Sequence, residues 1–303
     1  MIEIKNVSKT FDDIKALDDV TATIEEGMIF GLVGSNGAGK STLLRSIAGI
    51  FKPDTGLISV DGKPVYENRD VKKEICFLSD SAWFKSGATP KSLSGYYKLM
   101  YPKFDEKKYR SLLEKFQMAE DRKISTFSKG MKKQLSVILG IATHCRYLLL
   151  DETFDGLDPV MRQAVKSLFA AEVMERDFTP VIASHNLREL EDICDHVGLL
   201  HKGGILFTKD LVEMKLNLQK VQCVLGRPEA EEKLFSLLQP LTKERRGAVL
   251  TVVCRGTKRE IMEKVAGLDP VFMEVLPLSL EEIFINETEA KGYDIKEFVD
   301  KNL

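Results

Sequence analysis

Several kinds of pattern are scarce in this 303-residue sequence, and each scarcity argues against a class of protein. No apolar run approaches the ~18–20 residues that a membrane-spanning helix needs. The five cysteines are scattered without a C-x-x-C pair, which predicts reduced, mostly buried thiols instead of a disulfide framework. Basic and acidic residues nearly cancel, at 44 against 46. This balance argues against a general binder of nucleic acid or of membrane surfaces.

The remaining composition is that of an ordinary globular protein. Apolar residues make up 44% of the chain and charged residues 30%, which is typical of soluble domains. A chain of this length predicts one large domain together with a smaller one. Residues 1–11 contain no signal-peptide core, so we expect the chain to stay in the cytoplasm.

A glycine-rich stretch, GSNGAGKST at residues 34–42, follows the apolar run 28–33 and precedes a helix-like segment. Its G-x4-G-K-S spacing is the P-loop pattern. Glycines let backbone N–H groups turn toward an anion, and the start of the next helix adds its own free N–H groups. Lys40 is expected to contact the outer phosphates and Ser41 to offer its hydroxyl to Mg²⁺. The predicted phosphate-binding residues are Ser35, Asn36, Gly37, Ala38, Gly39, Lys40, Ser41 and Thr42.

A pair of acidic residues ends the apolar stretch YLLLDE at residues 147–152. A carboxylate just past a buried strand lies at the edge of a sheet, so Asp151 is predicted to hold Mg²⁺ and Glu152 to act as general base toward water. His185 ends the next apolar stretch, 181–185, and is predicted to lie at the same edge near the γ-phosphate. A helix cap or a solvated acidic pair is the alternative for the carboxylates, and a structural role is the alternative for His185.

Strand and helix patterns alternate along the chain, which predicts an α/β fold with a largely parallel sheet. In such a fold the ligand lies at the carboxyl ends of the strands. Helical spacing at about 83–145 indicates a helical subdomain within a first domain of residues 1–218. Residues 219–285 predict a small βαββ-type or ferredoxin-like α/β domain with a regulatory or dimer-supporting role. The polar tail 286–303 is expected to be a loosely held helix.

The order of these motifs resembles the nucleotide-binding subunit of an ABC transporter, over about residues 1–215. FSKGM at 127–131 stands where that family has its signature motif, and TFDGLDP at 153–159 stands where it has its D-loop. The resemblance implies a P-loop NTPase fold of ABC ATPase type, in which two subunits pack head to tail around two ATP molecules. It also implies that Ser128 and Gly130 contact the γ-phosphate of the ATP held by the partner subunit.

The same resemblance assigns several other residues. It implies that Asp158 closes the D-loop, that His185 is the switch histidine, and that Phe11 stacks on adenine. Asp80 stands where the family usually has glutamine in its Q-loop, so its role is less defined. Two interpretations stay open: Asp80 ligates Mg²⁺, usually through water, or it caps the turn at 79–83.

The family's function gives the expected partners. The resemblance implies an ATPase coupled to transport, which works with multi-span membrane permease subunits on separate chains. It also implies a second ATP-binding subunit, for which another copy of this chain suffices, and a position on the inner face of the cell membrane. LSLEEIF at 278–284 is similar to the end of bacterial drug, bacitracin and lantibiotic exporter subunits, and residues 83–105 resemble a branch linked to GntR-type regulators. These likenesses favour export. The alternatives are a soluble ABC-type ATPase and a nucleotide-gated regulatory protein; a nucleic-acid partner is not expected.

Overall fold

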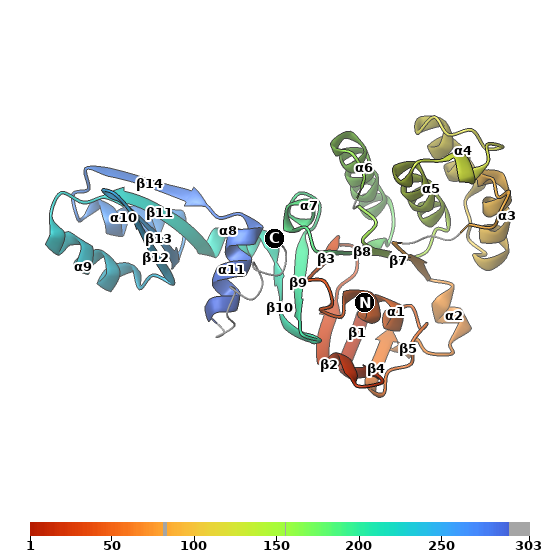
Figure 1. Cartoon of the computed structure of the whole chain (residues 1–303), viewed down its shortest axis with the longest axis horizontal. Coiled ribbons are helices and arrows are strands. Elements are labelled where there is room, and N and C mark those ends of the chain that lie inside the picture. Colours follow the sequence, from red (N-terminus) through yellow and green to blue (C-terminus); the bar gives the residue numbers. More distant parts are fainter. Residues whose placement is uncertain (81–83, 155, 291–303) are drawn as a thin grey trace. The chain divides into compact units, whose positions relative to one another are not determined.

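The computed structural model describes residues 1–80, 84–154 and 156–290 (Figure 1). Contacts divide the chain into two compact units, Met1–Thr208 and Lys209–Leu303. The first residue of the expected helical subdomain, residue 83, lies outside the described part. Most of the expected tail, residues 291–303, also lies outside it. Within the described part, the five cysteines are buried and free, as predicted. No helix there is long and apolar enough to cross a membrane.

A six-stranded sheet forms the centre of the first unit, with strand order β10-β9-β3-β8-β7-β6. Strand β3 pairs in parallel with β8 and with β9, and β7 pairs in parallel with β6 and with β8. The carboxyl ends of β3, β8, β7 and β6 therefore meet at one edge of the sheet, which is where a ligand is expected in such folds. The strands are β3 (Phe30–Val33), β6 (Ile75–Leu78), β7 (Tyr147–Asp151), β8 (Thr179–Ser184), β9 (His196–His201) and β10 (Gly204–Asp210).

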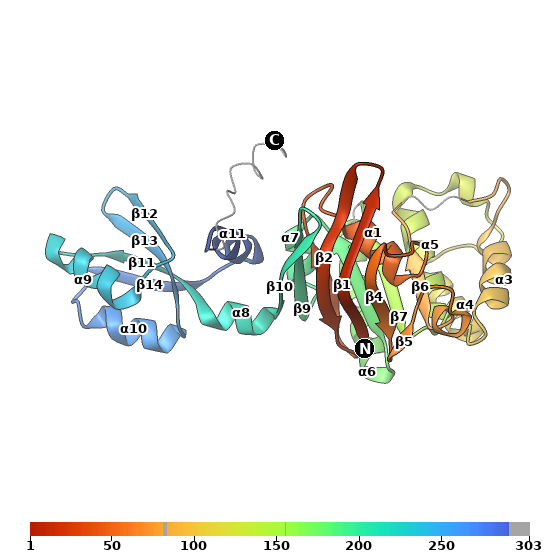
Figure 2. The same ribbon diagram turned by 90° about the horizontal axis from the view of Figure 1, so that it is seen from below.

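A second, antiparallel sheet covers helix α1 (Lys40–Ile47) from the side opposite the six-stranded sheet (Figure 2). Leu43, Leu44 and Ile47 of this helix are buried in one apolar cluster with residues of both sheets. The helix that follows the glycine-rich loop is thus fixed between two layers. The antiparallel sheet has the order β2-β1-β4-β5, formed by β1 (Ile2–Phe11), β2 (Ile14–Ile24), β4 (Thr55–Val60) and β5 (Lys63–Pro64).

Helices α3 (Pro90–Met100), α4 (Glu106–Lys115) and α5 (Lys129–Ala142) form the helical part of the first unit. Each begins at a capping side chain, from Thr89, Asp105 and Ser128 respectively, that accepts a hydrogen bond from a backbone N–H of the first turn. Such caps satisfy donors that a helix start leaves unpaired. The remaining helices of this unit are α2 (Arg69–Lys72), a 3₁₀ turn at Ile124–Thr126, α6 (Pro159–Glu175) and α7 (Leu187–Glu191).

A buried ion cluster joins α6 to α4. The Glu172 side chain is 2% exposed and lies 2.5 Å from Lys108 Nζ and 2.6 Å from Arg176 Nε. Arg176 also donates to the carbonyl of Cys145 at 2.6 Å. Burial by itself raises the pKa of Glu172, but the hydrogen bonds from Lys108 and Arg176 outweigh burial and lower the pKa below its ordinary value. The carboxylate is therefore charged in the folded protein and stabilises it.

We expect Glu172→Gln to lower the free energy of unfolding by about 3 kcal/mol near neutral pH, because Arg176 is left largely buried without its carboxylate. The folded pKa lies below the ordinary value of 4.5. The ionised group therefore stabilises the fold above that value and loses this contribution as pH falls through the folded pKa. Urea unfolding of variant and wild type, near neutral pH and in acid, measures the difference. A difference that does not shrink in acid would contradict the ionic origin.

The second unit contains a four-stranded antiparallel sheet with the order β12-β13-β11-β14. Along the chain, helix α9 follows strand β11 and helix α10 follows strand β13, which gives the βαββαβ order of a ferredoxin-like unit. Val221, Leu234 and Val252 are fully buried in its core. Its elements are β11 (Leu218–Val224), α9 (Pro228–Leu238), β12 (Thr242–Arg246), β13 (Val249–Arg255), α10 (Lys258–Ala266) and β14 (Phe272–Pro277).

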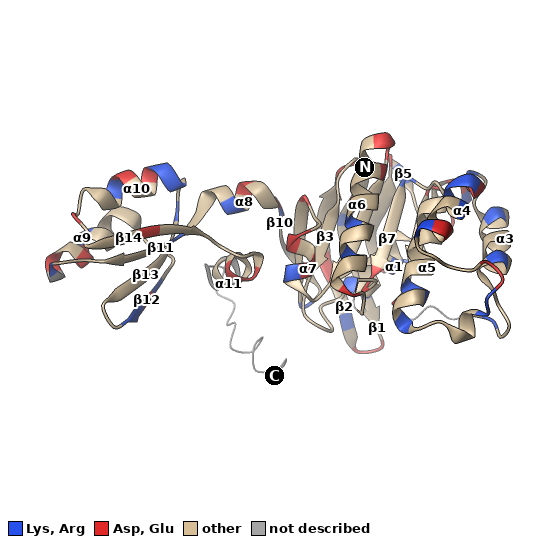
Figure 3. Cartoon of the chain, turned by 90° about the horizontal axis from the view of Figure 1, so that it is seen from above, with Lys and Arg blue, Asp and Glu red and all other residues tan. Residues whose placement is uncertain are grey.

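Two helices flank this sheet in sequence, α8 (Leu211–Asn217) and α11 (Leu280–Ala290), and α8 contacts both β11 and α11. Because of these contacts α8 belongs to the second unit, whereas the sequence placed the boundary after it, at residue 218. Figure 3 shows basic and acidic residues interspersed on the helices of each unit.

Candidate active site

The glycine-rich loop lies between β3 and α1, and close backbone contacts require two of its glycines, Gly34 and Gly39. A Cβ on Gly34 would lie 2.5 Å from the Leu200 carbonyl oxygen, and one on Gly39 would lie 2.4 Å from that of Ala16. Gly39 also has a φ of +104°, which other residues rarely adopt. Gly37 has a φ of +80°, and a Cβ there would meet no other atom within 4 Å. The sequence pattern therefore produces the loop geometry that an anion-binding turn needs.

Lys40 is the first residue of α1, and its side chain folds back over this loop. Its ammonium donates to the carbonyl oxygens of Gly34 at 2.7 Å and Ser35 at 3.1 Å, and it lies 3.3 Å from Glu152 Oε1. The residue is only 5% exposed. Burial lowers the pKa of Lys40, and the neighbouring carboxylate of Glu152 acts in the opposite direction. A cation is thus held between the loop and the acidic pair.

Asp151 ends β7 and contacts the first turn of α1. Its Oδ1 accepts a hydrogen bond from Ser41 Oγ at 2.8 Å, and its Oδ2 lies 3.8 Å from Arg45 Nη2. Burial raises the pKa of Asp151, while the contacts with Ser41 and Arg45 act against burial. A hydroxyl and a carboxylate are thereby held side by side next to the loop.

Glu152 follows directly and has a φ of +48°, an unfavourable conformation for a residue with a side chain. Its backbone N–H donates to the Ala183 carbonyl at 3.0 Å. Its carboxylate contacts Lys40 through one oxygen and His185 Nδ1 through the other, at 3.0 Å. Strained backbone that the surroundings hold in place is a recurrent feature of functional sites. Glu152 thus contacts both other residues predicted to be catalytic from the sequence, Lys40 and His185.

Asp80 lies two residues after β6, the next strand of the sheet. Its Oδ1 accepts a hydrogen bond from Lys133 Nζ at 2.9 Å, an ion pair that neither interpretation of the sequence included. Sequence reasoning missed Lys133, although a lysine two residues beyond the FSKGM motif could have indicated it. The pair borders a cavity of about 220 Å³ lined by Ser79, Asp80, Lys129, Lys132, Lys133, Ser136 and Thr153.

The other predicted residues lie at helix starts and at a strand end. Ser128 is exposed and caps α5 by accepting from the Met131 N–H at 3.2 Å. Asp158 is exposed and caps α6 in the same way, accepting from Met161 at 2.9 Å. A Cβ on Gly130 would lie 3.4 Å from the Gly156 carbonyl oxygen, so the FSKGM and TFDGLDP segments are neighbours.

Phe11 ends β1, and its ring meets Phe51 edge to face, with 5.2 Å between centroids. The residue is 39% exposed. An aromatic ring fixed in this way, with part of its surface open, is suited to stacking on a planar base.

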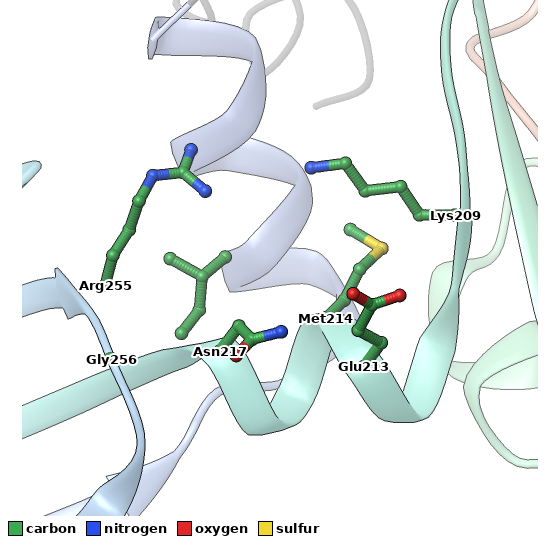
Figure 4. A pocket seen from close by; sticks show the side chains of 7 residues that line it. Lys209, Glu213, Met214, Asn217, Arg255 and Gly256 are labelled. Atoms are coloured by element: carbon green, nitrogen blue, oxygen red, sulfur yellow. The ribbon is translucent and has the colours of Figure 1, made fainter. Parts of the chain in front are cut away.

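A larger cavity, of about 430 Å³, lies in the second unit at helix α8 (Figure 4). No motif in the sequence indicates it. Lys209, Glu213 and Arg255 carry charges of both signs along its wall, and the Met214 side chain adds an apolar surface. Its full lining is Lys209, Glu213, Met214, Asn217, Leu218, Arg255 and Gly256.

Comparisons with known proteins agree on one family. Residues 17–155 match the profile described as "ABC transporter". The ABC transporter ATP-binding protein YtrB of Bacillus subtilis is 35% identical over 294 residues, which cover 96% of this chain and 99% of that protein. The bacitracin transport ATP-binding protein BcrA of Bacillus licheniformis is 28% identical over 209 residues, 68% of each chain.

Solved structures share the fold of the first unit. A dimeric bacterial ABC transporter cassette, MJ0796, superposes with a TM-score of 0.63 at 20% identity, covering 70% of this chain and 99% of that one. An ATP-binding subunit of an ABC transporter gives a TM-score of 0.65 at 24% identity, covering 71% and 92%. The P-loop NTPase fold of ABC ATPase type is therefore confirmed. The chain belongs to the ATP-binding proteins of the ABC transporter family, the ATPases that serve as motor subunits of these transporters.

Proposed function

We propose that this chain powers an exporter: it binds two ATP molecules between two subunits packed head to tail, hydrolyses them, and drives permease subunits on separate chains. The observation that supports this proposal most directly is the contact of Lys40, Glu152 and His185 at the carboxyl edge of the parallel sheet. A cation beside an anion-binding loop can hold phosphate oxygens, and a carboxylate with an imidazole next to it can position water and accept its proton, which are roles that phosphoryl transfer to water uses.

In this proposal the amides of residues 35–42 and the ammonium of Lys40 hold the phosphates of ATP. Water attacks the γ-phosphorus, and its proton passes to the carboxylate of Glu152. The bond from that phosphorus to the oxygen bridging the β- and γ-phosphates breaks, and ADP leaves with the bond's electron pair. His185, 3.0 Å from Glu152, keeps the carboxylate in line with the water.

The oxygen groups at the site fit Mg²⁺, and we propose that Ser41 and Asp151 hold it. Hydroxyl and carboxylate oxygens are the ligands this cation prefers, and phosphate oxygens complete its shell. When bound, Mg²⁺ would neutralise charge on the phosphates. Asp80 stays a candidate for a contact through water.

Ser128, Gly130 and Asp158 are proposed to complete the site of the second subunit. Ser128 is exposed at the start of α5, where free N–H groups and the helix dipole favour an anion. Phe11 is proposed to stack on the adenine of the subunit's own ATP. Each subunit would then supply half of each of the two ATP sites, so a homodimer suffices.

We expect Ser128→Arg to prevent the ATP-induced dimer and to leave ATP binding to the single subunit unchanged. The long side chain would fill the space that the partner's γ-phosphate needs, yet Ser128 lies outside the subunit's own loop. Light scattering with and without ATP measures the dimer, and fluorescence titration measures binding. Ser125→Arg, an exposed change just before the motif, is the control. A normal dimer in Ser128→Arg would remove this residue from the site.

The proposed partners are multi-span permeases, with the chain at the inner face of the cell membrane. The similarity to a bacitracin transport protein supports a role in transport. The support for export is the resemblance of residues 278–284 to the ending of exporter subunits. A soluble ABC-type ATPase or a nucleotide-gated regulator is the competing proposal.

Capture of Glu152→Gln with ATP from native membranes in mild detergent distinguishes the two proposals. Co-purification of a multi-span membrane protein supports the transporter motor. Purely soluble partners, with the chain absent from membranes, would contradict it. Lys40→Ala is the matched control, because we expect it not to bind the ATP that traps the complex.

A further inference from the structure

Lys133 connects the helix that begins at the FSKGM motif to the backbone of Glu152. It lies in the second turn of α5, and its ammonium donates to the Glu152 carbonyl oxygen at 2.6 Å and to Asp80 Oδ1 at 2.9 Å. Its side chain is 6% exposed, while that of Asp80 is 47% exposed. A buried ammonium is costly unless it is paired and hydrogen-bonded. These two acceptors therefore fix its position.

The Glu152 carbonyl is an acceptor with a structural consequence. Glu152 has a φ of +48°, a left-handed conformation that is unfavourable for a residue with a side chain and persists only where the surroundings impose it. The peptide before the residue is fixed by the N–H bond to Ala183, and the peptide after it is fixed by Lys133. The direction of the Glu152 side chain depends on both bonds.

We infer that Lys133 is a positioning residue for ATP hydrolysis: it holds Glu152 in the left-handed conformation that directs its carboxylate toward Lys40 and His185. This inference rests on the proposed role of Glu152 as general base. Lys133 acts through the backbone of Glu152 and touches no reacting atom. Asp80 acts as its counter-ion from the β6 edge, so one ammonium ties α5 to two neighbouring strand ends, those of β6 and β7.

The test is Lys133→Met, a change that keeps an unbranched apolar side chain of similar size and removes the donor. We expect kcat to fall by about 10- to 100-fold, the range for a small misplacement of a catalytic group, while the Kd for a fluorescent ATP analogue and KM stay within about twofold. Lys133→Arg keeps a donor and is expected to recover part of kcat.

The control is Lys132→Met, the adjacent lysine that lines the same cavity and is expected to leave kcat unchanged. Thermal unfolding of each variant separates loss of fold from loss of positioning, and Lys133→Arg provides a second reading if Lys133→Met unfolds. Single-turnover hydrolysis in the Glu152→Gln background completes the test. If Lys133 acts through Glu152, Lys133→Met adds no further loss there.

Two outcomes would overturn the inference: wild-type kcat in Lys133→Met, or an equal loss from Lys133→Met with and without Glu152. Failure of the proposed function looks different. In that case Glu152→Gln itself would hydrolyse ATP at the wild-type rate. A slow Glu152→Gln together with a fast Lys133→Met would reject the positioning role and leave the general base intact.

Discussion

Glu152→Gln is expected to lower the steady-state rate of ATP hydrolysis by about a thousandfold, within the range for loss of a general base. The amide occupies nearly the same volume as the carboxylate but cannot accept the proton of the attacking water. The phosphate contacts of the loop and of Lys40 are left in place, so ATP still binds. Without hydrolysis the ATP-bound dimer should persist. Phosphate release measures the rate, and light scattering in the presence of ATP measures the dimer.

Glu114→Gln is the matched control, since Glu114 is an exposed glutamate of α4 far in sequence from the acidic pair. It should hydrolyse ATP like the wild type. If Glu152→Gln releases phosphate at the wild-type rate, Glu152 is not the general base, and another side chain must accept the proton of the attacking water. Loss of ATP binding in that variant would instead show that the carboxylate supports Lys40 and the loop.

Lys40→Ala is expected to weaken ATP binding by at least about a hundredfold, corresponding to the several kcal/mol that a buried charged contact contributes. Lys40 is buried and held over the loop by the carbonyls of Gly34 and Ser35. Its removal leaves the triphosphate without the cation nearest to the loop. Titration with a fluorescent ATP analogue measures the dissociation constant, and hydrolysis should become undetectable.

An exposed lysine near the same helix provides the control. Lys52→Ala, a few residues beyond α1, should bind ATP as tightly as the wild type. An unchanged dissociation constant in Lys40→Ala would contradict the assignment of the loop as the phosphate site. A variant that fails to fold is recognised by its thermal unfolding, and Lys40→Met, which preserves the apolar stem of the side chain, then replaces it.

The ferredoxin-like second unit was only partly predictable. Strand β12 (Thr242–Arg246) has the sequence TKERR, and most of its residues are exposed. Such a segment lacks the apolar alternation that indicates a strand. It is a strand because its backbone pairs with β13 at the edge of the sheet. That pairing joins segments across a turn, and local composition carries no signal of it.

Local spacing along the chain determined the glycine-rich loop and the acidic pair of this protein. A strand, a turn of glycines and a helix start form one continuous segment, so the pattern at 34–42 determines its own geometry. In the same way, the buried strand before Asp151 places that carboxylate at the sheet edge. The family resemblance followed from the order of these segments, and the comparisons confirmed it.

Only the tertiary structure decided which of these residues touch. The order β3-β8-β7-β6 brings residues from four distant parts of the chain to one edge, and this order depends on non-local pairing. Because of this order Glu152 contacts Lys40 and His185. The packing of α5 against the same edge forms the ion pair between Lys133 and Asp80. A side chain's partner in a hydrogen bond depends on differences of about an ångström. Such differences arise from packing, and residue spacing does not encode them.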